Sequence, residues 1–323
     1  MGTVIDFVKG HCGWDAVTLI PEGQIAATDE LASALKILGP PIYGGLEVGW
    51  LGRGDRPDQI KLRIVDSTTK TWLPMCGGMT QVIGKALVET FLRDHFEVDV
   101  TQPLLKVKLL TTAGQIPIQV AIRDRKASVV TTVMDDYVSY LYQGGVEPLV
   151  LEDVPLLRVG AFAVIDVVIL EKKYPEVNFA RRDPGRHLDI VNAVLRAFRR
   201  HLGVSGVYGM LYDDRPEKVG QFRVFPRFFS DDLAVARFPW EFQCGTGSIA
   251  VAVALAHEGR LPSVIGNEDV LFEWGSYRAT PDPYGIRTSR LHLELKEKRV
   301  TRASFSHSVV EILTVGKLTL PGY

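Results

Sequence analysis

Two cysteines in this chain stand at glycine-rich turns that lead directly into predicted helices. The clearer case is Cys244, which is followed by Gly-Thr-Gly-Ser and then by an Ala- and Leu-rich run that stops at Gly259. A helix is therefore expected to begin at Cys244, and the first N–H groups of a helix have no partner within it. Those groups, together with the positive end of the helix dipole, stabilise a thiolate. Such a thiol suits a residue that exchanges a proton near neutral pH.

An earlier stretch repeats this arrangement. Cys76 is followed by two glycines and then by apolar residues at helical spacing, which include Val82, Ile83, Ala86 and Leu87. The two cysteines lie about half the chain length apart. The repeat predicts two similar halves, each of which presents a cysteine at the N-terminus of a helix.

Composition narrows the class of protein. The 323 residues include 37 Lys and Arg against 38 Asp and Glu, a net charge of −1, so no basic surface for nucleic acid is implied. Three cysteines, each next to a glycine, do not suggest a disulfide framework and indicate reduced thiols. The N-terminal residues lack a secretory pattern, and the longest uncharged apolar run, 249–256, is too short to span a bilayer. We therefore expect a soluble, cytoplasmic protein with no membrane or nucleic-acid partner.

Strand patterns surround both predicted helices. Three alternating runs after the Cys76 helix are typical of a β-meander, and in the second half a strand-like run precedes an amphipathic helix. Each half thus reads as strands, one helix led by cysteine and more strands, which favours an α+β fold over alternating βαβ units. These runs cover residues 104–111, 116–122 and 128–133 for the meander, 157–170 for the later strand run and 188–201 for the amphipathic helix.

The two halves are interpreted as two domains. The first covers residues 1–145 and contains the central helix led by Cys76. The second covers residues 146–300 and contains the central helix led by Cys244. The β-rich residues from about 300 to 323 are expected to return to the first domain.

At these residues the sequence resembles the proline racemase family and, more distantly, diaminopimelate epimerase. The resemblance is dense at the turn and helix after each cysteine, and weaker segments lie at Thr112-Ala113-Gly114 and Gly160-Ala161-Phe162. The closest match runs from Cys244 to Leu261 and corresponds to the second cysteine motif with its Ala-rich helix.

The resemblance implies a fold and a chemistry. The implied fold is diaminopimelate epimerase-like: two pseudo-symmetric domains, each a β-barrel-like sheet wrapped around a central helix, with the site in the cleft between them. The implied activity is inversion of a carbon next to a carboxylate, without a cofactor. Cys76 and Cys244 are the implied catalytic pair, in which one takes the proton as thiolate and the other returns a proton as thiol. The residues expected to bind the substrate through their closely approaching backbone are Gly77, Gly78, Gly245, Thr246 and Gly247.

The sequence departs from the family pattern at two places. The family's His after the first Cys-Gly is Gly78 here, and its Asp-Arg-Ser-Pro before the second cysteine is Trp240-Glu241-Phe242-Gln243. The usual partners of a ring or amino nitrogen are therefore missing, so the resemblance supports the reaction class better than the substrate. Glu241 is a candidate replacement for the lost acid, and an exposed cap or salt-bridge role fits it equally well. His11 stands where the family has a His-Thr turn, so we expect either a substrate contact or a structural hydrogen bond.

Three functional interpretations stay open. The leading one is an amino-acid racemase or epimerase, for which the resemblance implies no pyridoxal phosphate. A metal site is not expected either, since no Cys-x-x-Cys or His-x-x-x-His pairing occurs. The second is a double-bond isomerase of an unsaturated di- or tricarboxylate, which shares the proton transfer and would explain the missing nitrogen ligands. The third is a catalytically silent homologue that binds a small carboxylate, although the retention of both cysteines argues against it. Each interpretation has a small-molecule carboxylate or amino acid as partner, and a homodimer is left open.

Overall fold

The computed structural model divides the chain into two compact units. Residues 1–136 together with 309–323 form the first unit, and residues 137–308 form the second. The helix α4 (Asp135–Gln143) begins at the end of the first unit and continues into the second. The structure describes residues 3–12, 15–26, 29–38, 47–66, 70–176, 188–213, 215, 221–230, 244–261, 269–274 and 287–320.

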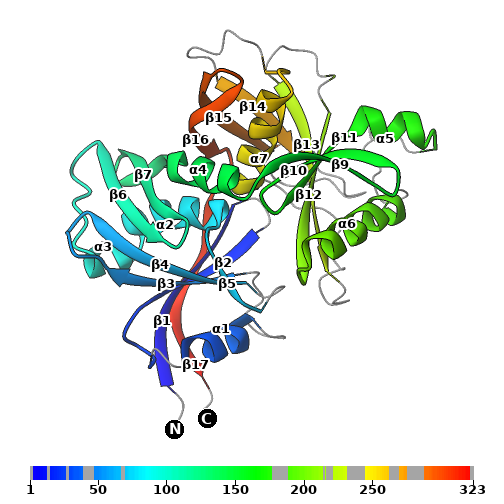
Figure 1. Cartoon of the computed structure of the whole chain (residues 1–323). Coiled ribbons are helices and arrows are strands. Elements are labelled where there is room, and N and C mark those ends of the chain that lie inside the picture. The colour runs from blue at the N-terminus through cyan, green and yellow to red at the C-terminus, as the bar shows by residue number, and fades with distance from the viewer. Residues whose placement is uncertain are drawn as a thin grey trace. The chain divides into compact units, whose positions relative to one another are not determined.

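The first unit is a mixed sheet with helices on both of its faces (Figure 1). Its strands are β1 (Thr3–Cys12), β2 (Asp15–Pro21), β3 (Glu47–Arg53), β4 (Gln59–Asp66), β5 (Trp72–Leu73), β6 (Leu104–Thr111), β7 (Gly114–Arg123), β8 (Lys126–Val133) and β17 (Glu311–Leu320), and its helices are α1 (Glu30–Leu38), α2 (Gly77–Glu89) and α3 (Leu92–His95). The strands lie in the order β17-β1-β2-β3-β4-β6-β7-β8, with β5 beside β4. Because β1 and β17 are antiparallel, with Thr3 opposite Leu320, the two ends of the chain lie side by side (Figure 1).

The second unit is also a mixed sheet. Its strands are β9 (Val146–Leu151), β10 (Val154–Val159), β11 (Phe162–Asp166), β12 (Gly206–Asp213), β13 (Gln221–Ser230), β14 (Asp269–Trp274), β15 (Arg287–Lys296) and β16 (Arg299–His307), and its helices are α5 (Val167–Lys173), α6 (Leu188–Leu202) and α7 (Gly245–His257). These strands pair in the order of the chain, from β9 to β16.

The two sheets repeat one topology. From β17 to β8, successive pairs are antiparallel, antiparallel, parallel, antiparallel, parallel, antiparallel and antiparallel, and the series from β9 to β16 is identical. A helical connection joins each parallel pair, as parallel strands require: α1 and α2 in one unit, α5 with α6, and α7, in the other. The predicted pseudo-symmetric α+β fold is confirmed. Among the strands that the structure describes, no pairing closes either sheet into a complete barrel.

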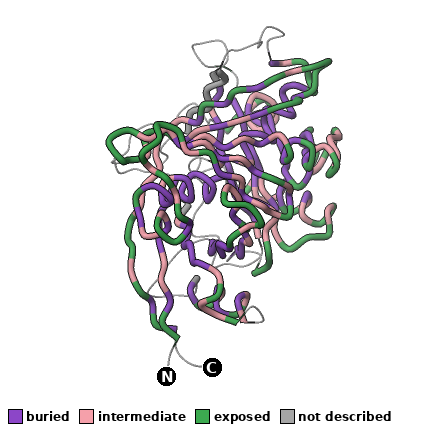
Figure 2. The backbone as a smooth tube through the Cα atoms, turned by 90° about the vertical axis from the view of Figure 1, so that its left-hand side faces the viewer, coloured by how far each residue is buried: buried purple, intermediate pink, exposed green. Residues whose placement is uncertain are grey.

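The helices α2 and α7 lie in the interior of their units. In each, eleven of the thirteen residues are buried (Figure 2). A helix that is apolar on every side must be covered on every side, and α7 is almost entirely Ala, Val, Ile and Leu after its first turn. Each fully buried Val or Leu side chain stabilises the fold by about 1.5–3 kcal/mol. The core of each unit therefore fixes the position of the helix that starts at a cysteine.

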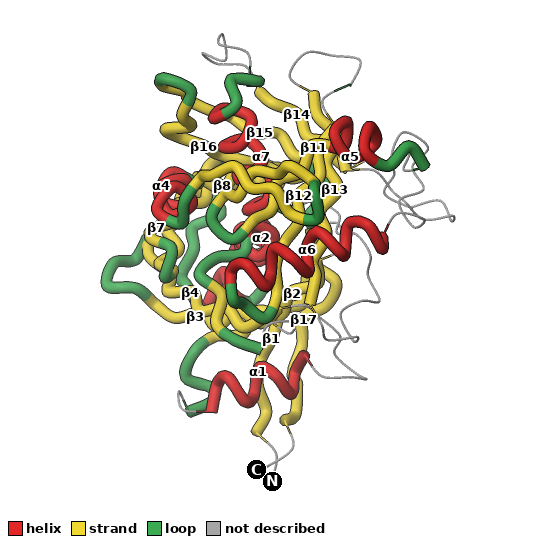
Figure 3. Tube along the Cα trace, turned by 45° about the vertical axis from the view of Figure 1, so that its right-hand side comes forward, coloured by secondary structure: helices red, strands yellow, loops and turns green. Residues whose placement is uncertain are grey.

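The helices α1 and α6 cover the opposite faces of the sheets. The helix α6 packs against β12 and β13 (Figure 3). Its Val191, Val194, Leu195 and Phe198 are fully buried, and its last turn is basic. Trp50 of β3 belongs to the matching core under α1. With helices on both faces of the sheet, β3 is buried throughout except at its last residue, and this includes the carboxyl-bearing Glu47 at its start.

Two sequence-based element assignments are wrong. The strand run predicted over 157–170 contains the end of β10, β11 and then the helix α5. Strand pairing stops at Asp166 because its Oδ1 accepts the N–H of Val168 at 2.7 Å and caps α5. The helix α4 was not predicted, and its two first residues, Asp135 and Asp136, are favourable at a helix N-terminus. The predicted meander and the amphipathic helix α6 are confirmed.

Gly84 of α2 allows β7 and β8 to approach the helix. A Cβ at this position would lie 2.5 Å from Val130 Cγ1 and 3.1 Å from Val120 Cγ2. Gly84→Ala should therefore lower the free energy of unfolding by about 1–3 kcal/mol, although Ala alone favours helix by about 1 kcal/mol. Adding Val130→Ala removes the clash, so the double variant should lose less stability than the two single losses together. Urea unfolding measures all three values.

Gly316→Ala on β17 is the matched control for this experiment. A Cβ there would lie 3.7 Å from the nearest atom, on Phe7, which is ordinary contact. Its effect should stay within about 0.5 kcal/mol. Strict additivity of Gly84→Ala and Val130→Ala would show that the helix and β8 do not meet at these atoms.

Candidate active site

Cys76 is the residue that caps the N-terminus of α2. Its backbone is extended, with φ −131° and ψ 119°, and its Sγ accepts the N–H of Met79 at 3.2 Å. The residue is 6% exposed. The prediction that a helix begins at this cysteine is confirmed. A sulfur that accepts an N–H at the positive end of a helix is stabilised as a thiolate.

Cys244 caps α7 in the same way. Its φ is −106° and its ψ is 106°, and its Sγ accepts the N–H of Gly247 at 3.3 Å. The hydroxyl of Thr246 lies 3.6 Å from the same sulfur. Cys244 is partly exposed, whereas Cys12, the third thiol, is fully buried in β1. Each unit thus has a cysteine sulfur that caps its central helix, at equivalent places in the two sheets.

The first N–H groups of both helices point to an anion site. Met79 and Gly247 donate to the capping sulfurs, and Thr80 and Ser248 donate to the carbonyls of the cysteines. Within the described part of the chain, no residue accepts a hydrogen bond from the N–H groups of Gly77, Gly78, Gly245 and Thr246. Helix N–H groups of this kind bind carboxylates and phosphates.

Buried hydroxyl and amide groups hold the first turn of α2 in place. Thr80 Oγ1 donates to the carbonyl of Gly77 at 2.7 Å and lies 2.7 Å from Thr132 Oγ1 on β8. Gln81 Nε2 donates to the same Thr132 oxygen at 2.6 Å. Sequence analysis missed Thr132 and Gln81, although a polar residue in an otherwise apolar buried helix is a visible signal. On α7 the corresponding bond is simpler, because Ser248 Oγ donates to the carbonyl of Cys244 at 2.8 Å.

A methionine fills the space beside the first helical turn in both units. In the first, Met79 Sδ of α2 lies 2.5 Å from the place of a Cβ on Gly49 of β3. In the second, Met210 Sδ of β12 lies 2.4 Å from the place of a Cβ on Gly247, and Cys244 Sγ is 3.0 Å from the same point. Strands β3 and β12 hold equivalent places in the two sheets. The methionine thus comes from the helix in the first unit and from the strand in the second, and the glycine comes from the opposite element in each.

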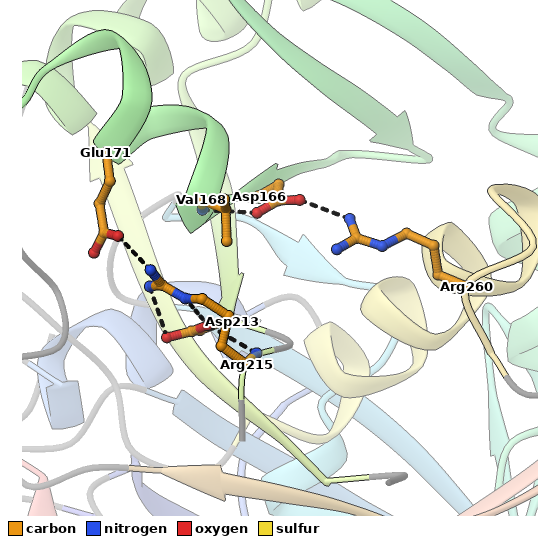
Figure 4. A network of polar contacts seen from close by, with 6 residues as sticks. All are labelled: Asp166, Val168, Glu171, Asp213, Arg215 and Arg260. Carbon is orange, nitrogen blue, oxygen red and sulfur yellow. Dashed lines mark hydrogen bonds and ion pairs between the residues drawn. The ribbon is translucent and has the colours of Figure 1, made fainter. Parts of the chain in front are cut away.

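Arg260 ties the C-terminal end of α7 to β11 and β12. Its Nη1 donates to Asp166 Oδ2 at 2.6 Å (Figure 4). The same Nη1 donates to the hydroxyl of Tyr212 and lies 3.5 Å from Glu258 Oε2. Burial, reinforced by the carboxylates of Asp166 and Glu258, raises the pKa of Tyr212 far above its usual value, so the hydroxyl stays protonated. The cluster fixes the axis of α7 from the end opposite to Cys244.

A second ion-pair cluster holds the end of β12 to α5 (Figure 4). Arg215 Nε donates to Asp213 Oδ1 at 2.8 Å, and Arg215 Nη1 donates to Glu171 Oε2 at 2.7 Å. Burial alone would raise the pKa of Asp213, but the hydrogen bonds from Arg215 outweigh it and hold that pKa below its usual value. These charges are therefore compensated by one another.

His307 is a neutral histidine in the interior of the second unit. Its Nδ1 lies 2.6 Å from Ser289 Oγ, and burial lowers its pKa to about 3. The turn of the same hairpin, at Lys298, approaches Gly259 beyond the end of α7.

His11 and Glu241 are the two other residues that the sequence predicts at the site. His11 of β1 is buried, and its Nε2 lies 3.3 Å from Glu311 Oε2 on β17. The adjacent Gly10 faces α2, since a Cβ there would lie 2.6 Å from Val82, so His11 lies on the opposite face of the strand. Glu241, like the Trp240 position, lies outside the residues that the structure describes. A substrate contact from His11 or Glu241 stays a prediction.

The described residues offer neither a metal-binding cluster nor a membrane-spanning helix. In the part of the chain that is described, no group of three or more His, Cys, Asp or Glu side chains is arranged to hold a metal ion. None of the helices in that part is long and apolar enough to cross a bilayer.

Comparison with known proteins adds a likeness of fold. No protein-family model matches the chain, and no curated protein matches it by sequence. Solved structures do match. A hydroxyproline epimerase from Agrobacterium vitis, with bound trans-4-hydroxy-L-proline, is 14% identical at a TM-score of 0.65 and covers 99% of this chain and 94% of its own.

Two further structures agree with the first. A probable proline racemase from Agrobacterium radiobacter K84, with bound carbonate, is 14% identical at a TM-score of 0.67 and covers 98% of this chain and 93% of its own. A methylitaconate-delta-isomerase is 14% identical at a TM-score of 0.59 and covers 99% of this chain and 96% of its own. This chain has their fold. The predicted resemblance to proline racemase is thus confirmed at the level of the fold.

Thr132 should be a sensitive position in the first unit. Thr132→Val removes the hydroxyl oxygen that both Thr80 and Gln81 contact. The buried Thr80 hydroxyl and the buried Gln81 amide then lose this hydrogen-bond partner. The free energy of unfolding should fall by about 1–3 kcal/mol, while Thr132→Ser should keep most of the stability. Thr131→Val, at the next and less buried residue of β8, is the control and should change stability little. Equal effects of the two valine variants in urea unfolding would contradict the network.

His307 should make the protein less stable in mild acid. Its pKa of about 3 lies below the value of about 6.5 in the unfolded chain, so the unfolded state binds more protons between these values. The free energy of unfolding should therefore fall as the pH decreases from about 6.5, by up to about 1.4 kcal/mol per pH unit from this group. His307→Gln, which can keep a bond to Ser289, should reduce that slope. His201→Gln, at an exposed site, should leave it unchanged, and equal slopes in all three proteins would contradict the assignment.

Proposed function

We propose that this protein is a cofactor-independent racemase or epimerase that inverts a carbon next to a carboxylate with Cys76 and Cys244. One observation carries the proposal: both sulfurs cap buried central helices whose first N–H groups have no acceptor among the described residues. The likeness of fold to a hydroxyproline epimerase and a probable proline racemase supports it.

The proposed reaction moves one proton off the carbon and returns another. The thiolate of one cysteine takes the proton, and the electron pair of the broken C–H bond passes into the carboxylate to form an enediolate. The thiol of the other cysteine then gives its proton to the opposite face of the carbon. The products are the inverted acid, a new thiol and a new thiolate, so charge is conserved.

The backbone is proposed to stabilise the charge that develops on the carboxylate. The N–H groups of Gly77, Gly78, Gly245 and Thr246 are fixed before the reaction, and fixed donors lower the barrier without reorganising. Gly247 acts differently from the other four, because its N–H is already bonded to Cys244 Sγ. Its role is to hold the sulfur and to leave room for Met210.

The double-bond isomerase is the second candidate. It uses the same two thiols, but the proton returns to a carbon further along the conjugated system. The likeness to methylitaconate-delta-isomerase favours it, as does Gly78 at the position where the proline racemase pattern has a histidine. Both candidates need reduced thiols, which fits a reducing compartment such as the cytoplasm.

Proton exchange with solvent tests the proposal. The reduced protein is incubated in D₂O with L-amino acids, hydroxyprolines and unsaturated acids, and proton NMR follows each α- and allylic-proton signal. Washout of an α-proton with inversion of the same compound identifies a racemase or epimerase. Washout with a shifted double bond identifies the isomerase.

Single variants show whether both thiols take part. Cys76→Ser and Cys244→Ser should each lower the exchange rate by about 10²–10⁴-fold, because serine is a far weaker acid and its alkoxide is not available near neutral pH. Cys12→Ala is the matched control, since Cys12 is buried in β1, and it should retain the activity. The absence of exchange with every acid, or activity that survives the loss of either thiol, would contradict the proposal.

A further inference from the structure

Two buried carboxyl groups lie on the sheet face that covers the first turn of α2. Met79, in this turn, packs against Gly49 of β3, since its Sδ lies 2.5 Å from the place of a Cβ there. Glu47 stands two residues before Gly49 and therefore faces the same side. Asp66 of β4 is directly opposite Glu47, so the two side chains share this face. Glu47 is 4% and Asp66 is 3% exposed.

The two carboxyl groups lie toward the end of α2 that begins at Cys76. At the other end of β3, Arg53 donates to the carbonyl of His95, which follows α2 in the chain as the last residue of α3. The strand and the helix thus run in the same direction, and the start of β3 lies beside the start of α2. Glu47 stands about 7 Å before Gly49 along the strand, on the side of the capping cysteine.

The second unit shows that the fold does not require acids at this place. Met210 of β12 packs against Gly247, in the first turn of α7. Two residues before it stands Tyr208, which is paired with Phe228 of β13, and the centroids of the two rings are 4.8 Å apart. In the repeated topology β12 and β13 take the places of β3 and β4. Two aromatic rings therefore stand where the first unit has its two acids.

The charge of the acid pair suits a positive ligand. Two carboxylates side by side in a buried place are costly unless cations or hydrogen bonds compensate them. Arg63 of β4 lies on the opposite face of the sheet, where it pairs with Glu22 and Glu30. The start of α2, by contrast, offers N–H groups that suit a negative ligand. The same end of the first unit thus combines a place for a cation with a place for a carboxylate, as a zwitterion requires.

We propose that Glu47 and Asp66 bind the cationic amino group of the substrate, whose carboxylate is bound by the N–H groups at the helix start. The inference deepens the proposed function and rests on it. The two acids are specificity-determining residues in this role. Neither needs to lack a partner within the protein, since a carboxylate can accept about four hydrogen bonds.

The proposal separates the two candidate reactions. The His and Asp of the proline racemase pattern are replaced here by Gly78 and Trp240, and the acids of β3 and β4 supply a partner for the nitrogen from other elements. An unsaturated di- or tricarboxylate would bring further negative charge to the same place and would be repelled. The substrate is therefore an amino acid, which favours the racemase or epimerase over the double-bond isomerase.

Binding of matched pairs of ligands tests the proposal without turnover. Saturation-transfer NMR with the full-length reduced protein gives a dissociation constant for each amino acid and for the 2-hydroxy acid with the same side chain. Proline is compared with tetrahydrofuran-2-carboxylate, in which oxygen replaces the nitrogen. At least one amino acid should bind about 10–100-fold more tightly than its oxygen analogue, because the analogue loses a charge-assisted hydrogen bond. Tighter binding of the oxygen analogues, or of unsaturated tricarboxylates, would overturn the inference.

Two variants assign this preference to the acids. Glu47→Gln and Asp66→Asn keep the shape of each side chain and remove its charge. Each should weaken the binding of the amino acid about tenfold or more and leave its oxygen analogue unchanged, whereas a merely structural role would weaken both equally. Asp55→Asn is the control, since this carboxyl group, in the turn between β3 and β4, is 91% exposed. Urea unfolding shows that each variant is folded, and the preference of the wild type needs no variant.

Failure of the proposed function gives a different result. Preferential binding of an amino acid without proton exchange in D₂O would contradict the two-thiol reaction and would still support the role of Glu47 and Asp66. Exchange that needs both cysteines, together with equal binding of the two members of every pair, would overturn the role of the two acids alone.

Discussion

A helix that starts inside a protein must satisfy N–H groups that have no partner in the helix itself. In each unit of this chain the central helix is buried along almost its whole length, so its N-terminus lies beside the core rather than in a solvent-exposed loop. A cysteine sulfur takes one of these N–H groups, and the next residues approach closely because they are mostly glycine. The packing of the sheet around the helix thus places a thiol and a set of backbone N–H groups together at the start of the helix in each unit. The proposed chemistry follows from this constraint on packing.

The repeat of one topology in two units has preserved the central helix and changed its surroundings. The methionine beside the first turn comes from the helix in one unit and from the strand in the other. In the first turn of α2, Thr80 and Gln81 bond to Thr132 of β8, whereas among the described residues of α7 the hydroxyl of Ser248 bonds back to the carbonyl of Cys244. In both units, nevertheless, the N–H three residues after the cysteine is bonded to the cysteine sulfur.

The parts of the fold that the sequence predicts are those in which local signals agree. Cys-Gly turns followed by apolar helical runs predict both central helices, and alternating runs predict the meander β6-β7-β8. Local signals conflict after Asp166. The β-branched residues at the start of α5 favour a strand, but the side chain of Asp166 caps a helix there and ends the strand. The Thr132 contact and the Met210–Gly247 packing join residues far apart in the chain. The sequence therefore predicts that the two thiols lie at helix starts, but it does not predict which distant residues pack against those helix starts.

The central claim is that the two capped thiols and the N–H groups beside them serve a single carboxylate. The most direct measurement is the protection of the thiols from iodoacetamide by a planar unsaturated carboxylate that resembles the deprotonated substrate. If the account is correct, one bound equivalent should slow the alkylation of Cys76 and Cys244 together, with the same apparent dissociation constant for both. Protection of only one cysteine, or two dissociation constants for the two thiols, would contradict it.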